Sequence, residues 1–264
     1  MVEDHRSLRV ARRHRVWEIT LQRPELMNAF DEVSEMELTE VVRAAAVDAE
    51  VRALILLAEG RAFSAGGDFE LMLRCNGDLT ARLGALGRAR ALLEALHALH
   101  VPLVVGVQGA AVGLGASLVL AGDAVVASRN AKIADAHVSV GLAAGDGGVL
   151  FWPQSAGMLR ARRYLLTGEA ISAEQAFAFG LVTDLVDSPD EVAPEARAIA
   201  LKVASLPPLA VQATKRALNQ LTRQRAGEAV EGALLAEGHT LGSADLVEAI
   251  SAFREKRTPE FVGR

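Results

Sequence analysis

The chain has 264 residues, enough for one large domain or for a core domain with an appendage. The hydrophobic fraction is 51% but the aromatic fraction only 4%, so the core must be built mainly from Ala, Val and Leu. The net charge of −5 argues against a nucleic-acid-binding surface, and the single cysteine excludes an intrachain disulfide and favours a reducing compartment.

The N-terminal residues lack the apolar run of a secretory signal, so we expect a cytoplasmic protein. Apolar runs at 8–10 and 16–21 flank a basic turn and predict a hairpin. Asp31 is placed to cap a helix that ends near Ala46. Further strands are predicted at 51–57, 103–107, 124–127, 132–134 and 181–186, and further helices at 78–100, 114–121, 149–166 with an interruption at Pro153, 173–179 and 189–205.

The segment 101–122 has no charged residue and is long enough to cross a membrane as a helix. It contains Pro102, Gln108, Ser117 and five glycines, which favour a buried strand that enters a buried helix. Alternation of strands and helices over the first two hundred residues predicts an α/β core, residues 1–205. After the Pro207-Pro208 pair the pattern is entirely helical, which predicts a C-terminal helical region, residues 206–264.

Three loops that contain glycines, 60–68, 109–117 and 136–148, follow predicted strands, where open α/β folds usually bind ligands. Amides exposed in such loops and at a helix N-terminus can stabilise an oxyanion. The third loop has four glycines among thirteen residues, and each costs about 1 kcal/mol in a helix, so a regular helix is excluded there. It carries His137 and Asp146, a candidate proton-transfer pair, although the pair taken alone favours a surface turn in which Asp146 caps a helix and His137 is incidental.

Other motifs for catalysis are absent from the sequence. There is no G-x-S-x-G, H-E-x-x-H or Walker pattern, and Gly113-x-Gly115 lacks the third glycine of a dinucleotide fingerprint. Asp135 and His137 could nominally bind a metal, but no second cluster supports them, and we expect no metal site.

Five ordered motifs cover nearly the whole chain: I-T-L-Q-R-P-E-L-M-N-A-F (19–30), G-R-A-F-S-A-G-G-D-F (60–69), Q-G-A-A-V-G-L-G-A-S-L (108–118), L-L-T-G-E-A-I-S-A-E-Q-A-F-A-F-G-L-V (165–182) and S-A-F-R-E-K-R-T-P-E-F (251–261). In order and spacing the chain resembles the crotonase, or enoyl-CoA hydratase/isomerase, family. The resemblance implies an α/β spiral of ββα repeats with a C-terminal helical trimerisation region, in a homotrimer or a dimer of trimers. It also implies an acyl-CoA substrate, with coenzyme A as part of the thioester, and no tightly bound cofactor, membrane or nucleic-acid partner.

The resemblance also assigns site residues. The oxyanion-hole amides fall on Gly67 and Leu114, and the CoA-binding positions on Arg61, Ala65, Gly67, Asp68, Phe69, Phe253 and Lys256. Phe253 and Lys256 match contacts between subunits in the family, and a helix face packed on the chain's own core explains them equally well.

The departures from the family pattern concern the mechanism. The two glutamates that activate water in a hydratase are replaced by Ser117 and His137. Serine has no useful basicity, so the two-carboxylate mechanism is absent, whereas an isomerase needs one base, which Asp146 or His137 could supply. The resemblance then implies an enzyme that stabilises a thioester enolate, with His137 and Asp146 replacing the glutamate acid/base pair.

The third loop and the residues that follow it are also similar to the oxocamphor hydrolase branch of this family. There, His137 would activate water for carbon–carbon bond cleavage (a retro-Claisen reaction) of a β-dicarbonyl, with Asp146 orienting the ring. Glu35 stands where that branch has another functional histidine. A homologue that binds RNA or acts as a scaffold is a third alternative, which the acidic net charge disfavours.

Overall fold

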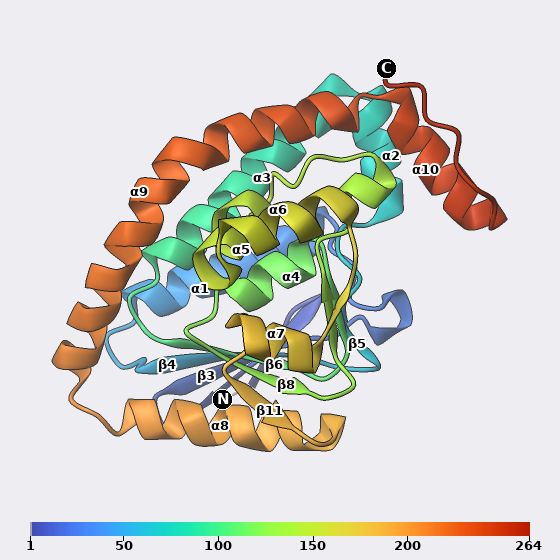
Figure 1. The fold of residues 1–264 in the computed structure, drawn as a ribbon. Helices are drawn as coiled ribbons and strands as arrows, with labels where there is room; N and C mark the ends of the chain where they lie inside the picture. Colours follow the sequence, from blue (N-terminus) through green and yellow to red (C-terminus); the bar gives the residue numbers. More distant parts are fainter. Residues whose placement is uncertain (1) are drawn as a thin grey trace.

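The computed structural model describes residues 2–264, and these residues form two sheets (Figure 1). The larger sheet has seven strands in the order β1-β2-β3-β4-β6-β8-β11, and the smaller has four in the order β10-β9-β7-β5. The strands are β1 (Val2–Asp4), β2 (Leu8–Arg13), β3 (Val16–Leu21), β4 (Ala53–Ala58), β5 (Ala62–Ser64), β6 (Leu103–Val107), β7 (Ala110–Val112), β8 (Ala124–Ser128), β9 (Lys132–Ala134), β10 (Ile171–Ser172) and β11 (Asp184–Val186).

Helices cover both faces of the larger sheet. In Figure 1, α8 lies along one face of the sheet, and the other helices, except the projecting α10, lie on the opposite side. The helices are η1 (Pro24–Leu26), α1 (Glu32–Val47), α2 (Phe69–Gly77), α3 (Leu79–Ala98), α4 (Leu114–Leu120), η2 (His137–Val140), α5 (Gly148–Ala156), α6 (Met158–Thr167), α7 (Ala173–Phe179), α8 (Pro189–Ala204), α9 (Pro208–Leu241) and α10 (Ala244–Glu255).

The middle of the chain repeats one unit: a strand of the larger sheet, a strand of the smaller sheet, then a helix. The units are β4-β5-α2, β6-β7-α4 and β8-β9-η2. The strands β4, β6 and β8 are parallel neighbours, and so are β5, β7 and β9. The segments that follow β5, β7 and β9 therefore meet at one edge of the smaller sheet. This is the expected α/β spiral of ββα repeats.

Several sequence predictions are confirmed by local chemistry. The hairpin forms between β2 and β3, with Leu8 opposite Leu21. Asp31 caps α1, because its carboxylate accepts a hydrogen bond from the Ser34 amide at 2.9 Å. The uncharged segment 101–122 contains β6, β7 and the buried helix α4, as expected.

Other predictions need correction. The loops 60–68 and 109–117 contain the short strands β5 and β7, which the glycines around them conceal. Helix α2 precedes α3 and was not predicted, and the last strand begins only at Asp184. Pro153 lies inside α5, and the break falls at Gly157, whose φ of +80° ends the helix. Pro153 is the sixth residue of this helix, so it removes one intrahelical hydrogen bond without ending the helix.

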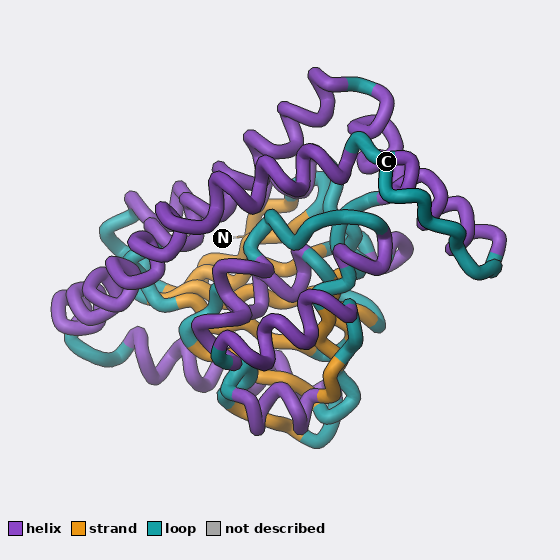
Figure 2. The backbone as a smooth tube through the Cα atoms, turned by 45° about the horizontal axis from the view of Figure 1, so that its top comes forward, coloured by secondary structure: helices purple, strands orange, loops and turns teal. Residues whose placement is uncertain are grey.

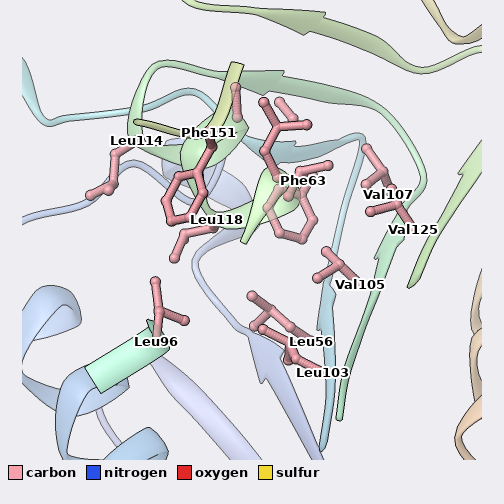
Figure 3. Close-up of a cluster of buried hydrophobic side chains, with 14 of the residues drawn as sticks. Leu56, Phe63, Leu96, Leu103, Val105, Val107, Leu114, Leu118, Val125 and Phe151 are labelled. Atoms are coloured by element: carbon pink, nitrogen blue, oxygen red, sulfur yellow. The ribbon is translucent and has the colours of Figure 1, made fainter. Parts of the chain in front are cut away.

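The main core lies between the larger sheet and the helices α1, α3, α4 and α5. Figure 3 shows how its side chains converge from the strands (Leu56, Leu103, Val105, Val107 and Val125), from β5 (Phe63) and from the helices (Leu96, Leu114, Leu118 and Phe151). Aliphatic residues dominate this cluster, as the low aromatic fraction predicts.

The C-terminal helices begin after α8 ends at Ala204, so the predicted boundary at 205 falls between helices. Helix α9 packs along α3 and α5, and its Val230 and Leu234 belong to the main core. In Figures 1 and 2, α10 and the C-terminal tail project from the body. The division into 1–205 and 206–264 stays a prediction. Within residues 2–264, no helix combines the length and the hydrophobicity needed to cross a membrane.

Candidate functional site

The segments that follow β5, β7 and β9 are in contact with one another. Gly66 has a φ of +90°, and a Cβ atom placed on it would lie 2.9 Å from the carbonyl oxygen of Val112. Gly113 has a φ of +54°, and a Cβ atom there would lie 3.4 Å from Cε1 of His137. A side chain on Gly66 would clash with the neighbouring segment, and the positive φ at both positions favours glycine. The site residues predicted in three separate motifs therefore come together.

Two backbone amides in these segments are free to bind a ligand. Phe30 donates its amide hydrogen to the carbonyl of Gly66 at 2.8 Å and accepts one from Asp68 at 2.9 Å. The intervening Gly67 amide donates to no acceptor in residues 2–264. Leu114 is the first residue of α4, so its amide has no partner within the helix.

His137 lies between two carboxylates at the start of η2. Its Nδ1 is 2.7 Å from Oδ1 of Asp135, and its Nε2 is 3.2 Å from Oδ2 of Asp146. The ring is buried, and burial lowers the pKa of His137, but the charges and hydrogen bonds of Asp146 and Asp135 outweigh that effect and raise the pKa well above its usual value. The two carboxylates therefore favour the imidazolium form, in which both ring nitrogens donate hydrogen bonds.

The glycines of the third loop hold Asp146 in place. Gly147 has a φ of +127°, and a Cβ atom on it would lie 2.9 Å from Cβ of Ser117. The hydroxyl of Ser117 in turn donates a long hydrogen bond of 3.4 Å to Oδ1 of Asp146. The simpler interpretation, a surface turn, is wrong because His137 and Asp146 are both buried.

The sequence motifs do not assign two residues of the site, Asp135 and Glu237. Asp135, fully buried, fixes the ring of His137 and was considered only as a possible metal ligand. Glu237 of α9 lies against Gly145, since a Cβ atom there would be 2.5 Å from Oε2 of Glu237. Its carboxyl makes no hydrogen bond within the described chain, and its Oε2 is buried. Burial and the negative charge of Asp146 raise the pKa of Glu237 to about 8.

Glu35 lies at the same cavity, on α1. Its Oε2 accepts a hydrogen bond from Nε of Arg88 at 2.7 Å. Burial raises the pKa of Glu35 to about 7, although the Arg88 guanidinium lowers it. The position where the oxocamphor hydrolase branch has a histidine is therefore occupied by a buried acid paired with a base.

These groups line one small cavity of about 60 Å³, which we call the acyl pocket. Its lining includes Gly67, Leu114, His137, Asp146, Glu35 and Glu237. A larger apolar groove of about 470 Å³ adjoins it and shares Gly67, Asp68, Met72 and His137 with it. The arrangement is a small pocket that contains the titratable groups, next to a larger apolar groove.

The groove contains five of the seven positions predicted to bind coenzyme A: Ala65, Gly67, Asp68, Phe69 and Phe253. Asp68 also caps α2, since its Oδ1 accepts a hydrogen bond from the Leu71 amide. Phe253 packs edge to face on Phe69 of the same chain, with ring centroids 5.4 Å apart. Arg61 and Lys256 are exposed and do not line the groove.

One group of side chains in residues 2–264 has the spacing for a metal ion. His137, Asp146 and Glu237 each offer a ligand atom, and these atoms lie within 4.8 Å of one another. The same side chains can exchange protons without a metal, because an imidazolium and a carboxylate are already in contact.

The comparisons with known proteins identify the family. The family model for enoyl-CoA hydratase/isomerase matches residues 11–264. The 2,3-dehydroadipyl-CoA hydratase of Escherichia coli (strain K12) is 38% identical over 262 residues, 98% of this chain and 99% of that protein. The 1,2-epoxyphenylacetyl-CoA isomerase of the same organism is 34% identical, over 94% of this chain and 95% of that protein.

Solved structures give the same result. An enoyl-CoA hydratase/isomerase from Mycobacterium paratuberculosis superposes with a TM-score of 0.89 at 36% identity, over 93% of this chain and 97% of that one. The spiral of ββα repeats, the five motifs and these matches lead to one conclusion: the chain belongs to the enoyl-CoA hydratase/isomerase family, and it is an enzyme of that family.

Proposed function

We propose that the chain processes acyl-CoA thioesters through an enolate, with His137 and Asp146 as the acid/base pair. The observation that carries the proposal is the contact between His137 and Asp146 in a cavity that also contains the free amides of Gly67 and Leu114. Family membership supports the thioester substrate, and the apolar groove offers room for the pantetheine arm of coenzyme A.

In this mechanism the thioester oxygen accepts hydrogen bonds from the amides of Gly67 and Leu114. As a proton leaves the carbon beside the thioester, negative charge develops on that oxygen, and the two donors stabilise it. The carboxylate of Asp146 takes the proton, and the imidazolium of His137 donates one to the carbon that needs it. A shift of the double bond requires one such base and no activated water, so isomerisation is the reaction we expect first.

Carbon–carbon bond hydrolysis is the second candidate. It is favoured by the approach of Asp146 to Nε2 of His137, which would stabilise the imidazolium formed when the ring takes a proton from water. The raised pKa of His137 opposes it, because the ring must be neutral to accept that proton.

The test is an activity panel with crotonyl-CoA, a 3-enoyl-CoA and a cyclic β-diketone, followed for hydration, double-bond shift and cleavage. We expect a double-bond shift with 3-enoyl-CoA. The variant Asp146→Asn should lower kcat by about 10²–10⁴-fold. The variant Asp190→Asn, an exposed carboxylate on α8, is the matched control and should retain activity. Full activity of Asp146→Asn would exclude the proposed base.

We also propose that Arg61, Ala65, Gly67, Asp68, Phe69, Phe253 and Lys256 contact coenzyme A. The support differs between them: Phe69 and Phe253 form one wall of the groove, whereas Arg61 and Lys256 carry exposed positive charge suited to phosphates. In the same proposal, residues 206–264 make contacts between the subunits of a homotrimer or a dimer of trimers.

A further inference from the structure

The acyl pocket is too small for a long acyl chain. Its volume is about 60 Å³. By comparison, a cavity of about 150 Å³ is large enough for benzene. A group of only a few non-hydrogen atoms therefore fits beyond the reacting carbons.

The inner wall of this pocket is polar on two sides. Glu237 enters from α9, and its carboxyl has no hydrogen-bond partner among residues 2–264. Glu35 enters from α1, and Arg88 occupies only its Oε2. The rest of the inner lining is apolar: Leu71, Cys75, Ala85, Leu86, Ala89, Leu142 and Leu241. An alkyl group alone would leave the buried Glu237 carboxyl unsatisfied, which is unfavourable.

The position of Glu237 indicates which atom it would bind. A carboxylate oxygen of Glu237 lies within 4.8 Å of the ligand atoms of Asp146 and His137. If Asp146 and His137 exchange protons with the second and fourth carbons of the acyl group, Glu237 is close enough to contact what lies next to them. A hydrogen-bonding group on the fifth carbon would then be within reach of Glu237.

The charged side chains around the pocket indicate whether the hydrogen-bonding group on the acyl chain is neutral or charged. Asp135, Asp146, Glu35 and Glu237 are four carboxyl groups, against the two bases His137 and Arg88. Arg88 is engaged by Glu35 at 2.7 Å and by Glu32 at 3.6 Å, and it does not line the pocket. A negatively charged acyl terminus would be buried there without a free cationic partner, because His137 is engaged by Asp135 and Asp146, and Arg88 by Glu35 and Glu32. Burial raises the pKa of Glu35 to about 7 and that of Glu237 to about 8, so each can donate as well as accept a hydrogen bond near neutral pH.

We infer that the acyl pocket selects a short acyl group with a neutral oxygen, a hydroxyl or a keto group, on the carbon beyond the reacting ones, and that Glu237 binds this oxygen. The inference rests on the proposed acyl-CoA function and specifies the substrate class. Plain alkyl chains and carboxylate-terminated chains are the groups that the pocket disfavours.

The test measures binding of saturated acyl-CoA thioesters, which cannot undergo hydration or a double-bond shift. Isothermal titration calorimetry compares 5-hydroxypentanoyl-CoA with pentanoyl-CoA, glutaryl-CoA and octanoyl-CoA on the full chain. We expect 5-hydroxypentanoyl-CoA to bind about tenfold or more tightly than pentanoyl-CoA, because a site built to bind a hydroxyl rejects the analogue without it. Glutaryl-CoA and octanoyl-CoA should bind more weakly than pentanoyl-CoA.

Variants of Glu237 test whether this side chain causes the preference for the hydroxylated thioester. Glu237→Met should reduce the ratio of the affinities for 5-hydroxypentanoyl-CoA and pentanoyl-CoA to about one while pentanoyl-CoA still binds, and Glu237→Gln, which can still hydrogen-bond, should retain part of the ratio. Glu228→Met, at an exposed position on the same helix, should leave the ratio unchanged. Equal affinity of the wild type for the hydroxylated and plain thioesters would overturn the inference, and so would tighter binding of glutaryl-CoA. Failure to bind any of the four thioesters, or coenzyme A, would instead overturn the proposed function.

Discussion

The side chain of His137 is set by two neighbours of the same charge. Asp135 holds Nδ1 at 2.7 Å and Asp146 holds Nε2 at 3.2 Å, so the ring can neither rotate nor change tautomer without losing a charged partner. A histidine held in this way is a better proton donor than acceptor at neutral pH, because its pKa is raised. In the proposed mechanism, His137 therefore supplies a proton at a position where the family resemblance implies a glutamate.

Glu237 gives a prediction about pH and stability. Its pKa is raised from 4.5 to about 8, so the folded protein holds a proton there that the unfolded chain releases. The free energy of unfolding should therefore fall as pH rises through this range, and Glu35 and His137, whose pKa values are also raised, act in the same direction. The contribution of His137 is fully present below about pH 6.5 and is lost as pH rises through its folded-state pKa.

Removal of the titrating carboxyl should reduce this slope. The measurement is urea denaturation at several pH values between about 5 and 7.5. The free energy of unfolding of Glu237→Gln should fall less steeply with pH than that of the wild type, and the two slopes should differ by up to about 1.4 kcal/mol per pH unit. Glu228→Gln, exposed on the same helix, should follow the wild-type slope. Parallel curves for wild type and Glu237→Gln would show that the carboxyl is not protonated in the folded protein.

Among the elements, those with strong local signals were predictable. The strand β6 has the predicted bounds because five buried residues in a row leave few alternatives, and α1 begins where Asp31 can cap it. The short strands β5 and β7 were not predictable, since three residues between glycines show no periodicity and become strands only by pairing with neighbours. Local sequence cannot reveal such pairing.

The same limit applies to the site. His137, Asp146, Gly67 and Leu114 were found because each lies in a motif, and the structure brings them to one cavity. Glu237 lies on a long helix, outside all five motifs and far along the chain from Asp146. In the sequence, Glu237 is an acidic residue on a helix like many others. It is buried because α9 packs against the third loop, and this packing cannot be read from the local sequence.

The turn before α5 gives a prediction at the scale of the element. In Gly147→Ala, the added methyl group meets the Cβ and Oγ of Ser117 at 2.9 Å, and the φ of +127° is unfavourable for alanine. The free energy of unfolding of this variant should be lower by about 1–3 kcal/mol. The variant should also lose activity, because Asp146 immediately precedes position 147. Gly87→Ala, on an exposed face of α3 with nothing within 4 Å of the new atom, should instead be more stable by about 1 kcal/mol. Thermal denaturation and the isomerase assay measure both effects, and a fully active, equally stable Gly147→Ala would contradict this account of the loop.

At the scale of the whole molecule, α9 has two roles. One side of it packs on α3 and α5 and brings Glu237 to the acyl pocket, and the other side is exposed. Leu218, Leu221 and Leu235 are between 58% and 70% exposed. Their spacings of three and fourteen residues place them on one side of the helix, since fourteen residues are nearly four turns. An exposed apolar stripe of this kind is typical of a surface that binds another protein chain.

We therefore expect α9 to contact a neighbouring subunit in the proposed trimer. Light scattering after size-exclusion chromatography should give three or six times the chain mass for the wild type. In the double variant Leu221→Glu/Leu235→Glu, charged groups would be buried in the contact without partners, so the mass should fall toward that of one chain. Leu201→Glu, half exposed on α8 at the opposite face of the larger sheet, is the control and should keep the wild-type mass. A wild-type mass of one chain at micromolar concentration, or an unchanged mass in the double variant, would rule out this side of α9 as the subunit contact.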